Sequence, residues 1–440
     1  MSRRAVITGL GVVTAYGVGL EALWAGLSSG RSALGPVKLF DASGFACSAG
    51  GEAEGVSAKD AVPKTYRKFV KVMARDTELA VVAAGLAVED AGLTTRAGEG
   101  EPTYAPGRMG CHIGAGLMAT ELKELTSALA TAIGEDGQFG LDAWGSKGIN
   151  NLQPLWLLKY LPNMLACHVT ILHGCEGPSN TLTDAEASGL LSLGESARVI
   201  QRGDAEVCFS GGAESKLNPM GVLRMTRAGR LAETNGADPA SLVRPYDAGA
   251  TGQLLGEGGG ILIVEEAEAA AARGAKVYAE ILGFGAGQSG RGLDSLTLEG
   301  EAPEVDDGLV GAIERALGEA GCGADEIDAI VPHAAGHVWM DSGEAGALRE
   351  VFGERLGSVP LVTLTPGIGE CMAGAGGVQA VVAAACLARG RLPGRIHAGS
   401  PTDGLDAGAA PERELSLKRV LVCTTSLGGA SAAIVLGRSG

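Results

Sequence analysis

The chain has 440 residues, which is long enough for two or three domains or for one large duplicated fold. Its 35 Lys and Arg against 51 Asp and Glu leave a net charge of −16, which excludes nucleic acid and an anionic membrane surface as partners, because both select a basic footprint. An apolar fraction of 46% indicates a globular protein, and 71 glycines indicate tight turns and close backbone approaches.

Nine cysteines are scattered along the chain without a Cys-x-x-Cys pair. The N-terminus lacks the apolar core of an export signal, and no apolar run approaches the roughly 20 residues of a membrane-spanning helix. We therefore expect reduced thiols, no disulfide framework and no cysteine-bound zinc, in a cytoplasmic protein that does not enter a membrane.

Six elements are predicted in the first part of the chain, in the order strand, helix, strand, helix, strand, strand. Their expected bounds are Ala5–Val13, Asp76–Gly92, Arg108–Gly116, Asp184–Ile200, Ala205–Gly212 and Gly260–Glu265. The same order recurs in the second part at Lys276–Phe284, Asp306–Gly321, Glu326–Gly336, Glu370–Leu387, Arg419–Gly429 and Ala432–Gly437. This internal repeat predicts two halves, residues 1–267 and 268–440.

The second helix of each half has small residues on nearly every face, which is typical of a helix buried between two layers. Strands alternating with helices indicate the α/β class, and the duplication predicts five layers, α/β/α/β/α. The first half carries extra length, mainly in Leu117–Leu165 and Lys216–Val243, and we expect these insertions to form a cap or interface region, the main one at about residues 117–165. Within it, the apolar stretch Leu155–Leu165 is expected to face a partner or line the core.

Several motifs resemble one family across nearly the whole chain. They are ITGLGVVTAYG (Ile7–Gly17), HVTILHGCEGPSN (His168–Asn180), SGGAES (Ser210–Ser215) and RPYDAGATGQLLGEGGGILIVEE (Arg244–Glu266). The chain resembles the β-ketoacyl-acyl carrier protein synthases, the condensing enzymes of fatty-acid and polyketide synthesis, which have the thiolase fold. The resemblance implies acyl carrier protein as a partner, a dimeric assembly and no cofactor.

In that family a cysteine at the N-terminus of the first buried helix takes the acyl chain as a thioester. Two histidines assist decarboxylation of the malonyl carrier, and backbone NH groups near a C-terminal glycine turn form the oxyanion hole. By resemblance, Glu186 occupies the cysteine position and Glu370 the position of the second histidine, whereas His333 keeps the first.

Further positions depart from the family. The lysine that holds the second histidine falls near Thr365, and two threonines that touch the phosphopantetheine arm align with Ala335 and His337. The resemblance implies that Asp341 and Glu344 hold the scaffold of the site. It also implies that four residues in loops of the second half bind substrate. They are Thr425, Gly428, Gly429 and His337.

A glutamate at position 186 cannot replace a thiolate in thioester exchange, because carboxylate attack gives a mixed anhydride that hydrolyses readily. Cys175 and Cys371 lie near the two key glutamates in sequence, and we interpret both as packed thiols. Condensation through a stored acyl-enzyme is therefore not expected.

The resemblance brings Glu186, His333 and Glu370 to one pocket. Helix dipoles favour the ionised carboxylates, whereas burial and mutual proximity are expected to raise the pKa of at least one. Two interpretations remain open: a structural knot with protonated His333 between two carboxylates, or an acid/base site around a bound thioester or alkene. A metal held by these three side chains is a third idea, but no local spacing supports it and none is expected.

The leading hypothesis is a condensation-incompetent partner subunit of fatty-acid or polyketide assembly, resembling chain-length factors, in a homodimer or in a heterodimer with a cysteine-bearing ketosynthase. The alternative is a redirected enzyme on acyl thioesters, a malonyl-carrier decarboxylase, hydrolase or dehydratase using Glu186 and His333. An ordinary 3-oxoacyl synthase comes third among these interpretations. It would need a nucleophilic cysteine from elsewhere in the chain, because position 186 holds a glutamate.

Overall fold

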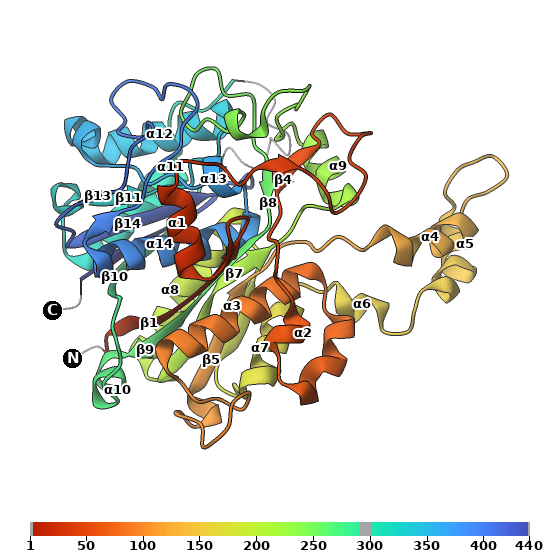
Figure 1. The fold of residues 1–440 in the computed structure, drawn as a ribbon, viewed down its shortest axis with the longest axis horizontal. Helices are drawn as coiled ribbons and strands as arrows, with labels where there is room; N and C mark the ends of the chain where they lie inside the picture. The colour runs from red at the N-terminus through yellow and green to blue at the C-terminus, as the bar shows by residue number, and fades with distance from the viewer. Residues whose placement is uncertain (1–2, 291–300, 439–440) are drawn as a thin grey trace.

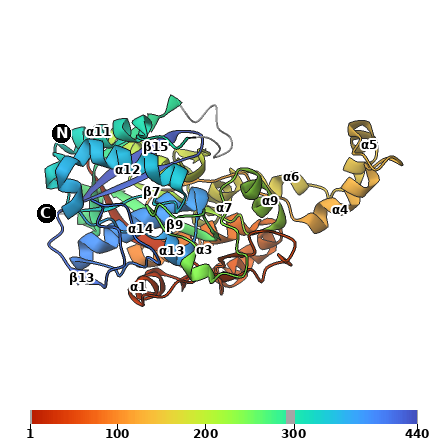
Figure 2. The same ribbon diagram turned by 90° about the horizontal axis from the view of Figure 1, so that it is seen from above.

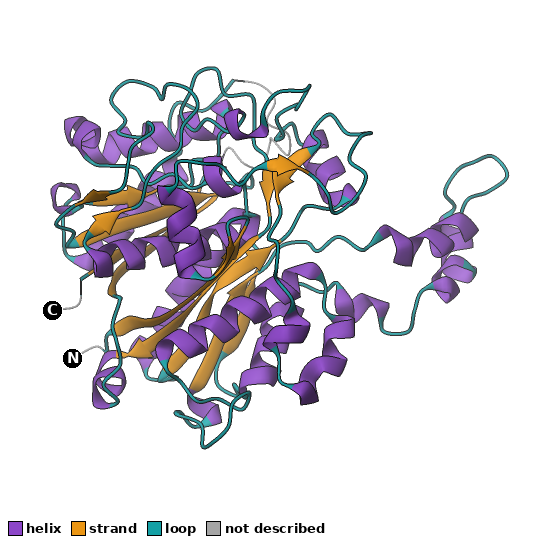
Figure 3. Cartoon of the chain, in the orientation of Figure 1, coloured by secondary structure: helices purple, strands orange, loops and turns teal. Residues whose placement is uncertain are grey.

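A computed structural model describes residues 3–290 and 301–438 of the chain, so the outermost bounds of the two expected halves, residues 1 and 440, lie outside the described residues. A ten-stranded sheet runs through it (Figures 1 and 3). Its strands lie in the order β6 (Ser179–Leu182), β5 (Met109–Gly114), β7 (Val207–Glu214), β9 (Gly258–Glu266), β1 (Ala5–Thr14), β10 (Ala279–Gln288), β15 (Ala430–Gly437), β14 (Arg419–Thr425) and β11 (Ala329–Val331), with β2 (Gly17–Val18) paired to β1.

Strand β1 joins the two parts of this sheet. Its antiparallel pairing with β9 extends from Ala5 to Val13, whereas its pairing with β10 is confined to Val6 and Ile7. Four helices complete a repeated order: α3 (Arg75–Ala91), α8 (Ser188–Arg202), α11 (Asp307–Ala320) and α14 (Ala375–Arg389). The order β1-α3-β5-α8-β7-β9 recurs as β10-α11-β11-α14-β14-β15, which confirms the predicted α/β duplication.

The helices form the outer and central layers. Helix α3 packs on β1 and β9, and α11 packs on β10 and β15 beside α12 (Val338–Phe352). Helices α8 and α14 lie between the two parts of the sheet and contact strands of both (Figure 1). The expected five layers are therefore present, with most residues of the two central helices buried.

Glycines allow the two central helices to approach closely. A Cβ atom on Gly189 of α8 would lie 2.7 Å from the backbone nitrogen of Gly377 of α14, and one on Gly377 would lie 2.2 Å from the carbonyl oxygen of Gly260. Side chains at these positions would force the layers apart, because interiors are close-packed. The close crossing brings the N-terminal ends of α8 and α14 together.

Both central helices begin later than predicted, and for the same reason. A left-handed residue precedes each, Ala185 with φ 46° and Met372 with φ 51°, and each opens a 3-10 turn, η4 (Ala185–Ala187) and η9 (Met372–Gly374). The uniform small-residue composition of these segments hides the turn. Glu186 consequently lies in the η4 turn and Glu370 lies just before η9, so neither is in the first turn of its α-helix.

Residues 117–163, which we call the arm, project from the body (Figures 1 and 2). The arm holds α4 (Leu122–Thr131), α5 (Leu141–Ser146), η3 (Gly148–Asn151) and α6 (Trp156–Lys159), after which α7 (Met164–His173) returns to the body. The expected insertion is therefore present. The two ends of its apolar stretch Leu155–Leu165 differ in exposure: Leu155 is 72% exposed, whereas Leu165 is fully buried.

The arm gathers exposed apolar side chains. They are Leu117, Leu122, Leu129, Ile133, Phe139, Leu141, Ile149, Leu155, Leu157 and Leu158, against six such residues in the rest of the described chain.

The remaining elements are short or peripheral. They are α1 (Leu20–Ser28), β3 (Gly35–Pro36), β4 (Ala49–Gly51), α2 (Ala58–Ala61), η1 (Lys64–Val72), η2 (Pro106–Arg108), α9 (Pro219–Arg227), η5 (Pro239–Ser241), β8 (Leu255–Gly256), α10 (Ala267–Ala272), η7 (Ala324–Glu326), η8 (Gly353–Ser358), α13 (Thr365–Ile368), β12 (Arg391–Leu392) and β13 (Arg413–Glu414). Strand β11 is much shorter than the predicted Glu326–Gly336, because the chain after Val331 leaves the sheet to form the loop of His333.

Among the described residues, Met372–Arg389 is long and apolar enough to cross a membrane by length and composition alone. Most of this segment is buried inside the protein, as part of the central layer. Its apolar composition is explained by that burial.

Candidate active-site cluster

Three elements bring the predicted site residues together. Glu186 lies in η4 before α8, Glu370 lies just before η9 and α14, and His333 lies in the loop after β11. All three side chains are almost completely buried. The close crossing of α8 and α14 brings the segments that carry the two glutamates near each other.

His333 and Glu370 are in direct contact, with 2.7 Å between Nε2 and Oε2. Burial alone would lower the pKa of His333, but the carboxylate of Glu370 outweighs it and raises that pKa to about 9. Burial likewise acts to raise the pKa of Glu370, yet His333 and Arg230 hold it below its ordinary value. Glu370 is therefore not a carboxyl whose pKa burial raises, because two neighbouring cations, His333 and Arg230, oppose that effect.

Glu186 does not contact His333 directly; its partner is Arg230, a residue that the sequence analysis missed. Arg230 donates from a terminal guanidinium nitrogen to Oε1 of Glu186 and from Nε to Oε1 of Gln253, at 3.0 Å. Gln253 in turn donates to Oε2 of Glu370, at 3.4 Å. The site is thus a five-residue network and not the three-residue cluster expected.

No sequence signal singled out Arg230. It lies beyond α9, in the segment expected to form part of a cap, and its role depends on reaching Glu186 through the tertiary fold. Arg230 is 2% exposed, and an arginine buried to that degree is held by paired carboxylates. With Arg230 and protonated His333 opposing Glu186 and Glu370, the buried charges balance.

Two polar atoms of the network have no hydrogen-bond partner among the described protein atoms. They are Oε2 of Glu186 and Nδ1 of His333. One carboxylate oxygen and one imidazole nitrogen are therefore left to bind something other than this chain, or an ordered water.

The backbone of the His333 loop is held by Glu344. Its two carboxylate oxygens accept from the NH groups of His333 and Ala334, each at 2.8 Å, and Oε2 also accepts from the hydroxyl of Tyr246. Asp341 accepts from the NH groups of Tyr246 and Gly336 in the same way. Burial raises the pKa of Glu344 and raises that of Asp341 to about 7.

His337 caps α12 and touches the segment of Arg230. Its Nδ1 accepts from the NH of Trp339 at 3.2 Å, so Nε2 donates to the carbonyl oxygen of Gly229 at 3.1 Å. Burial lowers the pKa of His337, and Arg230 adds to the effect. His337 is therefore placed to support the backbone beside Arg230.

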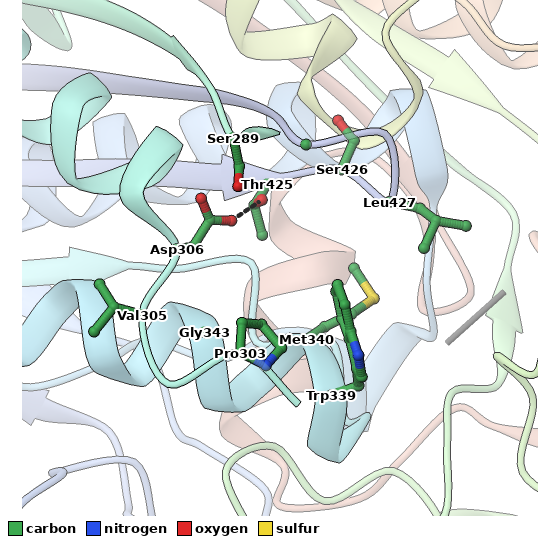
Figure 4. Close-up of a pocket in the computed structure, with 11 residues that line it drawn as sticks. Ser289, Pro303, Val305, Asp306, Trp339, Met340, Gly343, Thr425, Ser426 and Leu427 are labelled. Atoms are coloured by element: carbon green, nitrogen blue, oxygen red, sulfur yellow. Dashed lines mark hydrogen bonds between the residues drawn. The ribbon is translucent and has the colours of Figure 1, made fainter. Parts of the chain in front are cut away.

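Thr425 and Gly429 line a narrow pocket of about 30 Å³ (Figure 4). In it the Thr425 hydroxyl donates to Oδ2 of Asp306 at 2.8 Å, and Trp339, Met340 and Leu427 form an apolar wall. We call this the Trp339 pocket. Gly428 lies in the same turn, where its carbonyl oxygen accepts from the Gln288 amide at 2.8 Å.

A second pocket lies on the arm side of the network. Its volume is about 430 Å³, and we call it the Met225 pocket. It is lined by Gly116, Leu117, Pro162, Thr183, Ala185, Glu214, Lys216, Met225 and Met372. Lys216 is paired with Glu214 and donates to the carbonyl oxygen of Leu117 at the root of the arm.

The cysteines do not offer an activated thiolate at the network. Cys371 is fully buried, and burial raises its pKa well above the ordinary value, while burial raises the pKa of Cys175 to about 12. Thr365, at the expected lysine position, donates to the carbonyl oxygen of Ala334. Within residues 3–290 and 301–438, no three His, Cys, Asp or Glu side chains are arranged to hold a metal ion.

The fold and this site define a thiolase-like ketosynthase scaffold. Residues 2–270 match the Beta-ketoacyl synthase, N-terminal domain, and residues 278–399 match the Beta-ketoacyl synthase, C-terminal domain. The chain therefore belongs to the beta-ketoacyl synthase family of fatty-acid and polyketide synthesis.

Relatives match along the entire length. The chain is 30% identical over 426 residues to 3-oxoacyl-(acyl-carrier-protein) synthase 2 of Synechocystis, covering 97% of this chain and 95% of the relative. It is 28% identical over 440 residues to the protein of that name from Vibrio cholerae, covering 99% of each.

Solved structures agree. The ishigamide ketosynthase/chain length factor is 27% identical with a TM-score of 0.81, and 100% of each chain is covered. A beta-ketoacyl synthase from Burkholderia phymatum, 24% identical with a TM-score of 0.82 and the same coverage, shows the common fold.

Proposed function

We propose that this chain is a condensation-incompetent member of its family that acts as a partner subunit, in the manner of a chain-length factor. The observation that carries the proposal is the buried ion pair of Glu186 with Arg230, at the position where the resemblance expects the acylated cysteine. A carboxylate engaged by a guanidinium is a poor nucleophile, and an anhydride formed there would not persist. The halves 1–267 and 268–440 serve here as scaffold.

The arm supports a partner role. Ten exposed apolar side chains on a projecting segment are costly in water and are typical of a surface that another protein covers. Strand β6, at the edge of the sheet, pairs only with β5 among the described strands, so its other edge offers free backbone groups. We propose that the arm and this edge contact a second subunit, either another copy or a cysteine-bearing ketosynthase.

A basic surface supports acyl carrier protein as a further partner. Turn η1 exposes four cationic side chains, those of Lys64, Arg67, Lys68 and Lys71. Lys59, also exposed, precedes them in the chain. Tyr66 and Phe69 of the same turn pack on the body and fix its orientation. In a protein of net charge −16, this concentration of positive charge suits an acidic partner. We infer a cytoplasmic location from the same partners.

The decisive experiment compares the purified chain alone with the chain co-expressed with a cysteine-bearing ketosynthase. We expect no acyl-enzyme and no condensation from the chain alone, and a stable complex either with itself or with the synthase. A monomer that binds neither, or an acylated species on the chain alone, would overturn the proposal. Mass spectrometry of the intact protein after incubation with acyl-carrier substrate separates these outcomes.

One observation favours a second function, a redirected acyl-thioester enzyme. The unpartnered Oε2 of Glu186 and Nδ1 of His333 would serve as a base and an acid for decarboxylation, hydrolysis or dehydration. Release of CO₂, free acid or alkene from acyl- or malonyl-carrier, abolished by Glu186→Gln, would support this function. Activity retained in Glu186→Gln would exclude it.

A further inference from the structure

Arg230 belongs to a chain of buried contacts that links residues of the Trp339 pocket to residues of the Met225 pocket. The Met225 pocket ends at Ala185 and Met372, the two left-handed residues beside Glu186 and Glu370. The wall of neither pocket includes Glu186 or Arg230. Residues of the buried network thus adjoin both pockets without lining either one at Glu186 or Arg230.

Contacts run without interruption from one pocket to the other. Ala185 of the Met225 pocket adjoins Glu186, which binds Arg230, and Arg230 binds Gln253. The amide of Gln253 then reaches Sδ of Met340, at 3.8 Å, and Met340 is a wall of the Trp339 pocket. Every side chain between the two walls is buried.

We propose that Glu186, Arg230, Gln253 and Met340 form a closed bar that divides one passage into two blind pockets, and that the bulk of Arg230 is the part that closes it. A thioester arm entering at Trp339 would then stop at Met340, before the glutamate. This goes beyond the missing nucleophile: the site is sealed as well as chemically altered. A cysteine restored at position 186 would still be out of reach.

Charge makes Arg230 a firm closure. Its guanidinium is held by Glu186 and attracted by Glu370 and Glu214, so moving it toward solvent would leave the buried carboxylate of Glu186 without a cation. His337 and Gly229 hold the adjoining backbone. A methionine side chain is flexible by itself, but the amide nitrogen of Gln253 contacts Sδ of Met340 and restrains it here.

The test places a reporter thiol at position 186 and measures its alkylation by iodoacetamide, followed by peptide mapping. The matched pair is Glu186→Cys/Arg230→Met, which keeps the bulk without charge, and Glu186→Cys/Arg230→Ala, which removes the bulk. We expect the alanine variant to react about tenfold faster or more, because a sealed site reacts only through local opening. Equal rates in the two variants would overturn the proposal.

The single variant Glu186→Cys gives a second, independent reading. A retained Arg230 would lower the pKa of a neighbouring thiol, so an open site predicts that the single variant reacts faster than the alanine variant. A closed site predicts the opposite order. Buried Cys371 and Cys386 report on folding in the same maps, since both would react only if a variant unfolded.

The result is separable from the proposed function. Subunit binding is measured by co-purification and does not depend on the passage. Fast alkylation of the thiol in all variants would contradict the proposed closed bar but would not affect the proposed role as a partner subunit.

Discussion

Arg230 and Glu186 form an ion pair in which neither side chain is more than 2% exposed, although 44 residues separate them in the chain. The pair is linked through Gln253 to a second one, His333 with Glu370. Two cations and two anions thus fill the centre of a scaffold whose relatives are condensing enzymes. We expect both ion pairs to affect the free energy of unfolding, which can be measured.

Removing one charge of the first pair should be much worse than removing both. Arg230→Met leaves Glu186 buried without a cation, which we expect to lower the free energy of unfolding by about 3–5 kcal/mol. Glu186→Gln/Arg230→Met should recover a substantial part of that loss. Urea unfolding measures both, with Arg227→Met on the exposed end of α9 as the control. A double variant as unstable as the single would contradict the coupling.

His333 should titrate near pH 9 in the folded protein. Because this pKa lies above the unfolded value of about 6.5, the stabilisation by protonated His333 is complete below about pH 6.5 and is lost as the pH rises through about 9. NMR of the imidazole nitrogens measures the midpoint. His112 and His173, whose pKa values burial lowers to about 4, provide internal controls. A midpoint for His333 below 6.5 would contradict the ion pair with Glu370.

Glu344 should be sensitive even to an isosteric change. In Glu344→Gln the amide group would face one of the backbone NH groups of His333 and Ala334, leaving a buried donor unsatisfied. We expect a loss of about 1–3 kcal/mol in the free energy of unfolding. Glu350→Gln, exposed on the same helix α12, is the matched control and should change little. Equal stability of the two variants would show that the loop does not depend on Glu344.

The basic surface on η1 predicts salt-dependent binding of acyl carrier protein. The triple variant Lys64→Glu/Arg67→Glu/Lys68→Glu should weaken binding about tenfold or more at low salt, with the difference shrinking as ionic strength rises. Lys418→Glu changes an exposed lysine just before β14 and should have little effect. Surface plasmon resonance with immobilised carrier protein provides the measurement. Unchanged binding by the triple variant would move the docking site elsewhere.

The arm predicts an association that depends on its apolar side chains. Leu141→Ser/Leu155→Ser/Leu157→Ser should shift the protein toward monomer or abolish binding of a ketosynthase, because burial of these leucines would supply part of the interface energy. Leu39→Ser changes a leucine that is 54% exposed outside the arm and is the control. Sedimentation velocity distinguishes the states. Unaltered assembly in the triple variant would exclude the arm as an interface.

The repeated elements could be predicted because each depends on local pattern. Apolar runs predict the strands at Ala5–Val13 and before Glu265. Small residues such as Gly376, Gly377 and their neighbours are typical of a buried helix. The starts of α8 and α14 could not be predicted, since the left-handed turns at Ala185 and Met372 are imposed by the packing of the layers.

By itself the sequence determined the duplicated α/β architecture and the extra length of the first half, and it singled out Glu186 and Glu370 as candidate site residues. Periodicity and motif content are local properties that survive without coordinates. Only the tertiary structure decided which charge each acid meets. Arg230 reaches Glu186 across 44 residues, and the two cations beside Glu370 lower its pKa where burial alone would raise it, because electrostatic pairing depends on distance in space and not on spacing in the chain.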